Sequence, residues 1–229
     1  MNKINSELFD TLLGLPLFQG ISRGEFIEMM GRMRFVRKLF TAGTTVVSQD
    51  EPCQTLFFIL DGQITALHES DSRKYTLTEW LNPPIVLQPE ALFGLRTRYT
   101  ATYMAFTSVR ALEIDKAAVR DVLLTYEVFR LNYLNLLSTR LQQKQRDVWR
   151  PLPREASARF FRFLHVRLLR PAGKKELSVK MEVLADELQV TRLTVSRMLH
   201  DLSRKGLIVM RRGRIVIPSF EKLLLSSNV

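Results

Sequence analysis

Residues 181–205 constrain the fold more than any other part of the sequence, because two amphipathic helical patterns stand there only three residues apart. The first pattern covers residues 181–188 and the second begins at Arg192 and ends near Lys205. The residues expected to face inward are Val183, Leu184, Leu188, Val195, Met198, Leu199 and Leu202. A three-residue connection, Gln189-Val190-Thr191, makes the two helices cross at a tight turn, so the sequence predicts a helix-turn-helix.

Local signals define both ends of the second helix. Thr191 is expected to cap the helix through its hydroxyl, and Gly206 is expected to end it. Two short β-runs come next, at residues 207–209 and 215–217, joined by the basic segment Met210-Arg211-Arg212-Gly213-Arg214. A helix-turn-helix followed by a basic hairpin is typical of a winged helix.

The positive charge of the chain is concentrated in one region. The net charge is +11, yet residues 1–139 hold 14 Lys and Arg against 15 Asp and Glu, whereas residues 140–214 hold 19 against 7. A nearly neutral module joined to a strongly basic one indicates a polyanionic partner. The alternative is an interaction module with a solvated basic face that does not bind specific DNA.

A helix with arginines near its N-terminus fits the major groove of DNA, where arginine pairs with guanine O6 and N7. The residues predicted to read bases are Arg192, Leu193, Ser196 and Arg197. The residues predicted to contact phosphates are Lys180, Thr191, Arg211, Arg212 and Arg214. Phosphate contacts fix position without carrying sequence information.

The first half of the chain reads differently. Helical spacing over residues 6–33, broken at 15–18, gives way at Phe35 to short β-branched runs. Asp61-Gly62, flanked by apolar residues on both sides, predicts a β-hairpin within residues 55–69. Further runs lie at 72–81 and 100–115. Several short strands at regular intervals indicate an antiparallel barrel or sandwich.

A long helix is predicted over residues 121–149, because this segment contains neither proline nor glycine. Leu131, Leu134, Leu141 and Val148 fall on a heptad seam. Pro151 and Pro153 end the helix and mark the expected domain boundary. We expect the seam to pair with a second copy of the chain; packing on its own barrel alone is the alternative.

The stretch VLADELQVTRLTVSRMLHDLSRKGLI resembles the DNA-binding signature of the Crp/Fnr transcription regulators, whose core reads Ser/Thr-Arg-Glu-Thr-Val-Ser/Gly-Arg. LFTAGTTVVSQDEPCQTLFFILDGQITAL is similar to the first half of the family's cyclic-nucleotide-binding β-roll. The resemblance implies an α+β protein of three parts. Residues 1–120 form a sensory β-roll, an antiparallel jelly-roll, together with N-terminal helices. Residues 121–150 form a dimerisation helix, and residues 151–229 form a winged helix-turn-helix.

Carried over by residue, the resemblance makes Arg192 and Arg197 the two base-reading arginines and Thr191 the phosphate contact. Leu193 departs from the family, because it replaces the glutamate that accepts from cytosine and orients the arginines. Leucine can only touch a thymine methyl. We therefore expect a palindromic site whose half-site keeps the two guanines but loses the base pair that glutamate specifies. Gln189 also replaces the usual turn glycine.

The family's nucleotide site combines a Phe-Gly-Glu turn with Pro-Arg-Ser/Thr-Ala, and this sequence departs from both. Leu87-Gln88-Pro89 stands at the turn, with Glu90 one position late, and Tyr99 replaces the phosphate-binding arginine, with Arg98 one position early. Losing those charge-assisted hydrogen bonds, at about 1.5–3 kcal/mol each, argues against cyclic AMP as the effector. The residues that remain candidates for an effector pocket are Glu90, Arg96, Arg98, Tyr99, Thr100 and Gln145.

Other sensor types remain as alternatives. A cyclic-nucleotide-responsive regulator is one, and a haem-based gas sensor is another, for which His68, Cys53 and Met104 are ligands by residue type only. A single cysteine excludes a four-cysteine iron–sulfur cluster within one chain. No cofactor is predicted, and the effector is unknown.

The sequence indicates neither an enzyme nor a metal site, because its three histidines stand in unrelated elements with no motif around them. No run of about 18 apolar residues and no signal-peptide pattern is present, so no membrane span is predicted. We expect a cytoplasmic protein, because a single cysteine fits a reducing setting. The expected partners are double-stranded DNA and a second copy of the chain. RNA polymerase is a further candidate.

Overall fold

The computed structural model describes residues 3–226, and the chain divides into two compact units. Unit 1 comprises Met1–Ile64 and Asn82–Gln145, and unit 2 comprises Thr65–Leu81 and Arg146–Val229. The domain ranges predicted from the sequence place residues 65–81 with the sensory β-roll, whereas this segment packs within unit 2. The reason is a non-local pairing of strand β5 (Tyr75–Leu81) with strand β9 (Lys175–Val179).

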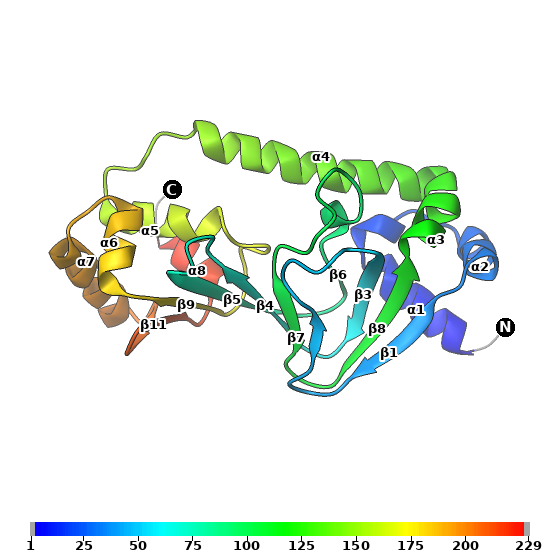
Figure 1. Ribbon diagram of the computed structural model, residues 1–229, viewed down its shortest axis with the longest axis horizontal. Helices are drawn as coiled ribbons and strands as arrows, with labels where there is room; N and C mark the ends of the chain where they lie inside the picture. The colour runs from blue at the N-terminus through cyan, green and yellow to red at the C-terminus, as the bar shows by residue number, and fades with distance from the viewer. Residues whose placement is uncertain (1–2, 227–229) are drawn as a thin grey trace. The chain divides into compact units, whose positions relative to one another are not determined.

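Unit 1 consists of short N-terminal helices, a four-stranded sheet, the paired strands β2 and β7, and the greater part of a long helix (Figure 1). Its helical elements are α1 (Lys3–Leu13), η1 (Pro16–Phe18), α2 (Arg23–Arg32), η2 (Pro89–Ala91), α3 (Lys116–Asp121), η3 (Leu123–Thr125) and α4 (Glu127–Trp149), whose last turn belongs to unit 2. Its strands are β1 (Val36–Phe40), β2 (Thr45–Val47), β3 (Thr55–Asp61), β6 (Ile85–Val86), β7 (Thr102–Ala105) and β8 (Val109–Asp115). The break predicted at residues 15–18 is confirmed as η1.

The strands of unit 1 pair in the order β1-β8-β3-β6, and β2 pairs separately with β7. The predicted hairpin at Asp61-Gly62 is therefore wrong in its pairing: β3 joins β8 and β6, while the next strand, β4 (Ile64–Glu69), belongs to another sheet. Gly62 is required for a different reason. A Cβ there would lie 2.1 Å from the carbonyl oxygen of Ser108, and its φ is +85°, so the glycine permits a close approach of two backbones.

The predicted long helix starts later than expected, and the prediction of one continuous helix from residue 121 is wrong. Two short helical pieces, α3 and η3, precede α4, which begins at Glu127. The hydroxyl of Thr125 donates to the carbonyl of Val122, and Tyr126 adopts an extended backbone. A threonine side chain that bonds a nearby carbonyl competes with helix formation, and Leu123 becomes fully buried at the interruption.

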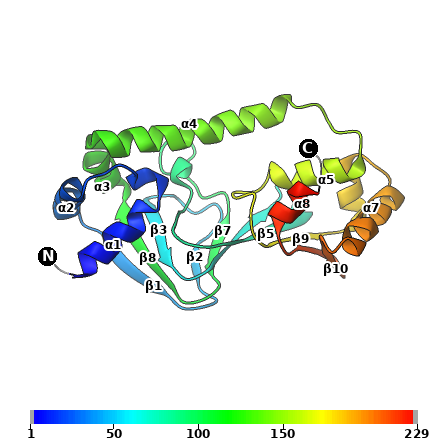
Figure 2. The ribbon, with the colours of Figure 1, turned by 180° about the vertical axis from the view of Figure 1, so that it is seen from behind.

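Unit 2 combines the elements of the winged helix with two strands from earlier in the chain. The earlier strands are β4 and β5. The others are α5 (Ala156–His165), β9, α6 (Met181–Leu188), α7 (Arg192–Arg204), β10 (Val209–Arg211), β11 (Arg214–Ile217) and α8 (Phe220–Leu225). The strands lie in the order β10-β11-β9-β5-β4. Figure 2 shows β5 and β9 beside α5 and α8.

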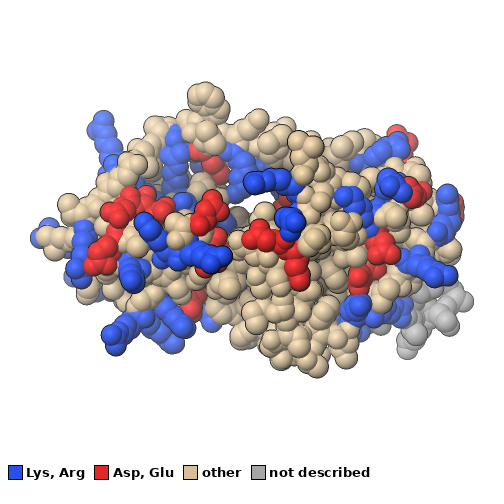
Figure 3. All heavy atoms as spheres, viewed as in Figure 1, with Lys and Arg blue, Asp and Glu red and all other residues tan. Residues whose placement is uncertain are grey.

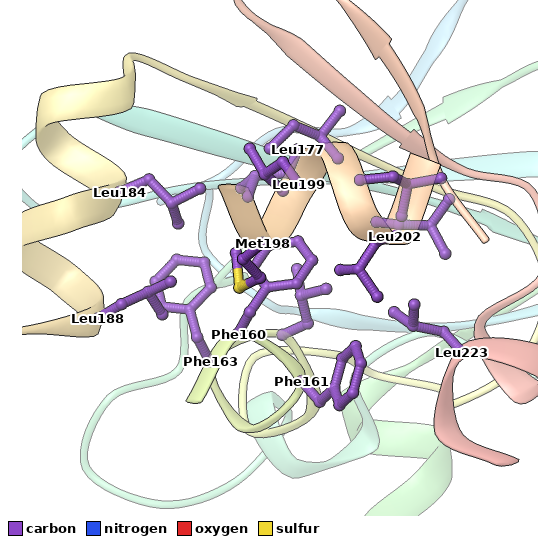
Figure 4. Close-up of a cluster of buried hydrophobic side chains, with 14 of the residues drawn as sticks. Phe160, Phe161, Phe163, Leu177, Leu184, Leu188, Met198, Leu199, Leu202 and Leu223 are labelled. Carbon is purple, nitrogen blue, oxygen red and sulfur yellow. The ribbon is translucent and has the colours of Figure 1, made fainter. Parts of the chain in front are cut away.

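The core of unit 2 is a single cluster of buried side chains from α5, α6, α7 and α8 packed on the strands (Figure 4). Phe160 and Leu199 are fully buried within it. All four residues predicted for the inner face of α7 belong to this cluster. Burial of one apolar stripe on α7 leaves its opposite face to solvent, where the predicted base-reading residues stand.

A buried ion pair joins β5 to β9. Glu79 and Lys175 stand directly opposite each other in the strand register and are both 0% exposed. Their nearest atoms, Nζ and Oε2, lie 3.0 Å apart. The backbone N–H groups of Leu169 and Arg170 donate to the same carboxylate, at 2.7 and 3.3 Å.

No helix within residues 3–226 is long and apolar enough to cross a membrane.

Candidate functional site

The turn between α6 and α7 has the tight geometry that its three residues predict. Gln189 ends α6 in the left-handed region, with φ +53°, and its N–H donates to the carbonyl oxygens of Ala185 and Asp186. A side chain in this region costs about 1–2 kcal/mol relative to glycine. Gln189 therefore keeps the turn that glycine usually makes, at an energetic cost.

Thr191 caps α7, as predicted. Its hydroxyl oxygen accepts from the backbone N–H of Thr194 at 3.2 Å and lies 2.8 Å from the Thr194 hydroxyl. The cap satisfies one of the free amides of the first turn and leaves others pointing outward. The Thr191 hydroxyl, which the sequence predicts to contact a phosphate, thus already has two hydrogen-bond partners, the N–H and the hydroxyl of Thr194.

The outer face of α7 presents the predicted base-reading residues together. Arg192 and Arg197 are exposed, Ser196 is half-buried, and Leu193 is 59% exposed. Leu193 and Arg197 are four residues apart, so their side chains are neighbours on one helix face. The exposed face of α7 therefore carries one apolar side chain beside its two arginines.

A hollow of about 570 Å³ lies between α7 and the β10–β11 hairpin. Its lining brings together five of the predicted DNA-contacting residues, namely Lys180, Arg192, Arg211, Arg212 and Arg214, with Glu182 as its one acidic member. In Figure 3 a cluster of Lys and Arg side chains stands at the lower left, where Figure 1 draws the hairpin. The hollow is accordingly suited to anions such as phosphates.

The hairpin concentrates positive charge at the expense of stability. Arg211 and Arg214 are directly opposed in the strand register, with Arg212 and Gly213 forming the turn between them. Like charges opposed across a strand pair repel. Among the three arginines of the described hairpin, Arg214 alone has a counter-charge, Glu176 at 3.5 Å. Because a polyanion would relieve this repulsion, the hairpin is best explained as a binding element.

Arg192 is not free in this state. Its Nη1 lies 3.1 Å from Oε1 of Glu182, in the first turn of α6, and both side chains are more than half exposed. Exposed pairs of this kind contribute about 0–1 kcal/mol, so base contacts can replace this one. The carboxylate beside Arg192 thus comes from Glu182 in α6. Position 193 of α7, where the resembled family has a glutamate, is leucine and supplies no carboxylate.

Arg159 is a positioning residue for the turn that the sequence alone did not indicate. From α5, it donates to the carbonyls of Leu188 and Gln189 at 3.1 and 2.9 Å, and to Pro153 at 2.7 Å. It therefore fixes the turn that sets the angle of the recognition helix. Its basic character alone gave no signal, since many arginines surround it in the sequence.

In unit 1, the two elements compared with the nucleotide site are joined by the protein's own hydrogen bonds. Gln88 takes the left-handed conformation, with φ +36°, and is only 3% exposed. Its side-chain carbonyl oxygen accepts from the N–H of Thr100 at 2.8 Å, and its amide nitrogen donates to the Thr100 hydroxyl. A glutamine side chain thus occupies space between these two elements.

Tyr99 points into the protein rather than outward. It is 2% exposed, and its hydroxyl donates to the carbonyl of Thr55 at 2.9 Å. Burial, followed by the contact with Cys53, raises the pKa of Tyr99. Burial also raises the pKa of the fully buried Cys53 thiol, which makes Cys53 a poor candidate for a reactive thiolate.

The remaining effector-pocket candidates are dispersed. Glu90 forms an ion pair with Arg140 of α4, and Arg98 donates to the carbonyl of Asp50. Arg96 and Gln145 are exposed. The structure therefore joins Thr100 to Gln88, turns Tyr99 toward Thr55, and pairs the Glu90 carboxylate with the long helix.

The residues named for haem have other surroundings. His68 lies in β4 with its Nε2 3.5 Å from Oε1 of Glu79, and Cys53 is buried. Met104 lies in β7. Across the part of the chain that the structure describes, no group of three or more His, Cys, Asp and Glu residues could hold a metal ion.

A capped helix with an exposed basic face, a tight turn and an arginine-rich hairpin define a winged helix-turn-helix DNA-binding protein. The chain belongs to the Crp/Fnr family of transcription regulators, which are not enzymes. Residues 158–225 match the Crp-like helix-turn-helix domain, and residues 37–126 match the cyclic nucleotide-binding domain. The α+β architecture predicted from the sequence is confirmed.

Known relatives cover nearly the whole chain. A CRP-like cAMP-activated global transcriptional regulator of Mycobacterium tuberculosis is 22% identical over 214 residues, 90% of this chain and 94% of that protein. The global nitrogen regulator of Nostoc sp. is 24% identical over 196 residues, 80% and 85% of the two chains. The solved structure of the c-di-GMP responsive regulator CLP of Xanthomonas campestris is similar with a TM-score of 0.51 and 20% identity, over 86% and 99% of the chains.

Proposed function

We propose that this regulator acts as a homodimer on a palindromic DNA site, with the two α7 helices in successive major grooves. Arg192 and Arg197 each read a guanine, and the arginines of the hairpin hold the neighbouring phosphates. Half-sites lie about one helical turn apart, as for other dimeric readers of this type. The observation that carries the proposal is the basic hollow beside the exposed face of a capped α7.

Dimerisation is supported by the outer face of α4. Apolar residues at heptad spacing stay in solvent along this helix: Leu131 is 50% exposed, Leu134 53%, Leu141 61% and Val148 76%. Ser138 and Gln145 interrupt this apolar seam, so it is too weak for an isolated coiled coil but can add to packing against another helix. A second copy of the same helix supplies a matching seam.

The test of DNA recognition is to sequence the genomic fragments that the purified protein retains. A palindromic motif with two guanines per half-site is expected. Arg197→Ala should weaken binding to that motif by about 1–3 kcal/mol and relax one guanine position. Arg73→Ala, which removes an exposed arginine from the β4–β5 turn, is the matched control. Equal weak binding to random DNA by every variant would support the non-specific interaction module instead.

We further propose that cyclic AMP is not the effector. This is supported by Gln88, which bridges to Thr100, and by Tyr99, which packs inward where a phosphate-binding arginine would be needed. Calorimetric titration with cyclic AMP and cyclic GMP should give no binding heat and no shift in melting temperature. Saturable heat with either nucleotide would overturn this proposal, and a Soret band after reconstitution would point to haem.

A further inference from the structure

A second cavity lies wholly within unit 2 and shares no lining residue with the basic hollow. It measures about 440 Å³. Its walls are the last turn of α4, the connection to α5, one face of α5 and the end of α8. The lining residues are Asp147, Arg150, Pro151, Pro153, Ala158, Phe161, Arg162, His165 and Leu224. Cavities of a few hundred cubic ångströms accommodate small organic ligands.

The lining combines apolar side chains with basic ones. Phe161, Leu224, Ala158 and the two prolines offer carbon surface, whereas Arg150, Arg162 and His165 supply basic groups. Asp147 is the single acidic residue of this lining. An apolar cavity with a few convergent polar groups is the usual form of a small-molecule site.

The cationic groups are positioned without a carboxylate partner. Arg162 donates through Nη1 to the carbonyl of Pro151 at 2.6 Å and through Nη2 to the carbonyl of Asp147 at 2.7 Å. Neutral carbonyls hold this guanidinium in place but do not cancel its charge. Neither Arg150 nor Arg162 forms an ion pair within the described residues, so no paired carboxylate neutralises these two lining guanidinium groups.

His165 adds an unsatisfied polar atom. Its Nδ1 is buried and has no hydrogen-bond partner among the described residues. A buried polar atom without a partner costs about 1–3 kcal/mol, and such atoms in a folded protein call for a specific explanation. Because protein atoms enclose this nitrogen, a ligand in the cavity would pair with it only after the side chains around His165 move.

We propose that this cavity binds a small aromatic or branched organic anion, with its carbon skeleton against Phe161 and Leu224 and its acidic group toward Arg150 and Arg162. The anion would compete with the carbonyls of Asp147 and Pro151 for Arg162. Those two carbonyls belong to the last turn of α4 and the connection to α5, so occupancy alters how firmly this connection is held. Binding itself does not depend on the proposed DNA recognition.

The test uses 8-anilinonaphthalene-1-sulfonate, an aromatic monoanion whose fluorescence rises in an apolar site, with the full-length protein. One saturable site per chain is expected. Ala158→Phe, which places a bulky ring in the cavity, should weaken binding at least tenfold. Arg150→Gln should weaken it about two- to fivefold, the scale of one exposed ion pair. Arg154→Gln, an exposed arginine on the same connection outside the lining, should leave it unchanged.

Arg150→Gln keeps the test decisive if Ala158→Phe does not fold, because Arg150 is exposed and its loss removes no buried contact. Equal binding by the wild type, Arg150→Gln and Arg154→Gln, or no saturable binding at all, would overturn the proposal. A retained-fragment DNA assay run in parallel separates the two proposals. Dye binding without sequence-specific DNA binding would refute only the proposed function, and the converse would refute only the cavity.

Discussion

Replacing Lys175 with methionine tests how β5 is attached to the winged helix. Lys175 is fully buried, and within the described residues its ionic partner is Glu79, also fully buried. Methionine has a similar length and no charge. The substitution leaves the Glu79 carboxylate in the protein interior with the N–H groups of Leu169 and Arg170, and with His68 3.5 Å away.

The expected cost arises from this isolated charge. Breaking a buried ion pair by removing one partner costs about 3–5 kcal/mol, and the two backbone donors keep Lys175→Met toward the lower end. Glu79→Gln alone should cost a similar amount, because it leaves a buried ammonium. In the double variant neither charge remains, and the introduced amide oxygen can still accept from the N–H of Leu169. We therefore expect the double variant to lose only about 1–3 kcal/mol, far less than the sum.

Urea denaturation followed by tryptophan fluorescence measures these costs. The chain has two tryptophans, and Trp80 lies in β5 with Nζ of Lys174 3.9 Å from its ring centroid. Because Trp149 is 86% exposed, Trp149→Phe gives a background in which Trp80 alone reports on this strand. Single-variant losses below about 1 kcal/mol, or additive losses in the double variant, would refute a desolvated ion pair.

Four further outcomes are expected. Burial tends to raise the pKa of Glu79, but His68, Lys175 and the amide of Leu169 outweigh burial and hold this pKa below its usual value. The stability that the lowered pKa gives is present above the unfolded pKa of about 4.3 and is lost as pH falls through the folded pKa. Acid titration should therefore lower the free energy of unfolding, reported by Trp80, more in the wild type than in the double variant that lacks both charges. Gln189→Gly should relieve the backbone strain at φ +53° and stabilise the protein by up to about 1 kcal/mol, because the greater freedom of glycine in the unfolded chain offsets part of the gain. A lower denaturation midpoint would contradict this strain. Leu134→Lys should convert dimers to monomers in analytical ultracentrifugation, while Asn135→Lys, exposed on the same helix, should not. Leu193→Glu should add one specified base pair to the selected half-site, and an unchanged motif would show that residue 193 does not read DNA.

Local physics made the recognition element readable from the sequence. Apolar spacing fixed the inner face of α7, Thr191 supplied its cap, and the predicted bounds of α6 match the structure. These features depend on neighbours within a few residues. The charge count then predicted a polyanionic partner, and the helix-turn-helix match agrees with it.

Strand pairing was not readable in the same way. Asp61-Gly62 has the composition of a hairpin turn, but the glycine is needed where Ser108 approaches, and β3 pairs with β8 instead of β4. A turn signal reports local backbone conformation, which a hairpin and a crossing between sheets can share. Which strand becomes the neighbour depends on contacts some fifty residues away.

The sequence by itself determined the two helices of the helix-turn-helix, the cap of α7, its exposed basic face and the family. The tertiary structure alone decided that Glu79 meets Lys175, that Gln88 meets Thr100, and that a cavity opens beside Phe161. Residue type and spacing do not predict these contacts, because each contact joins segments that are distant in sequence and are brought together only by packing. Burial then sets their energies, since a charge or amide that is ordinary in water becomes costly unless its partner lies within hydrogen-bond reach.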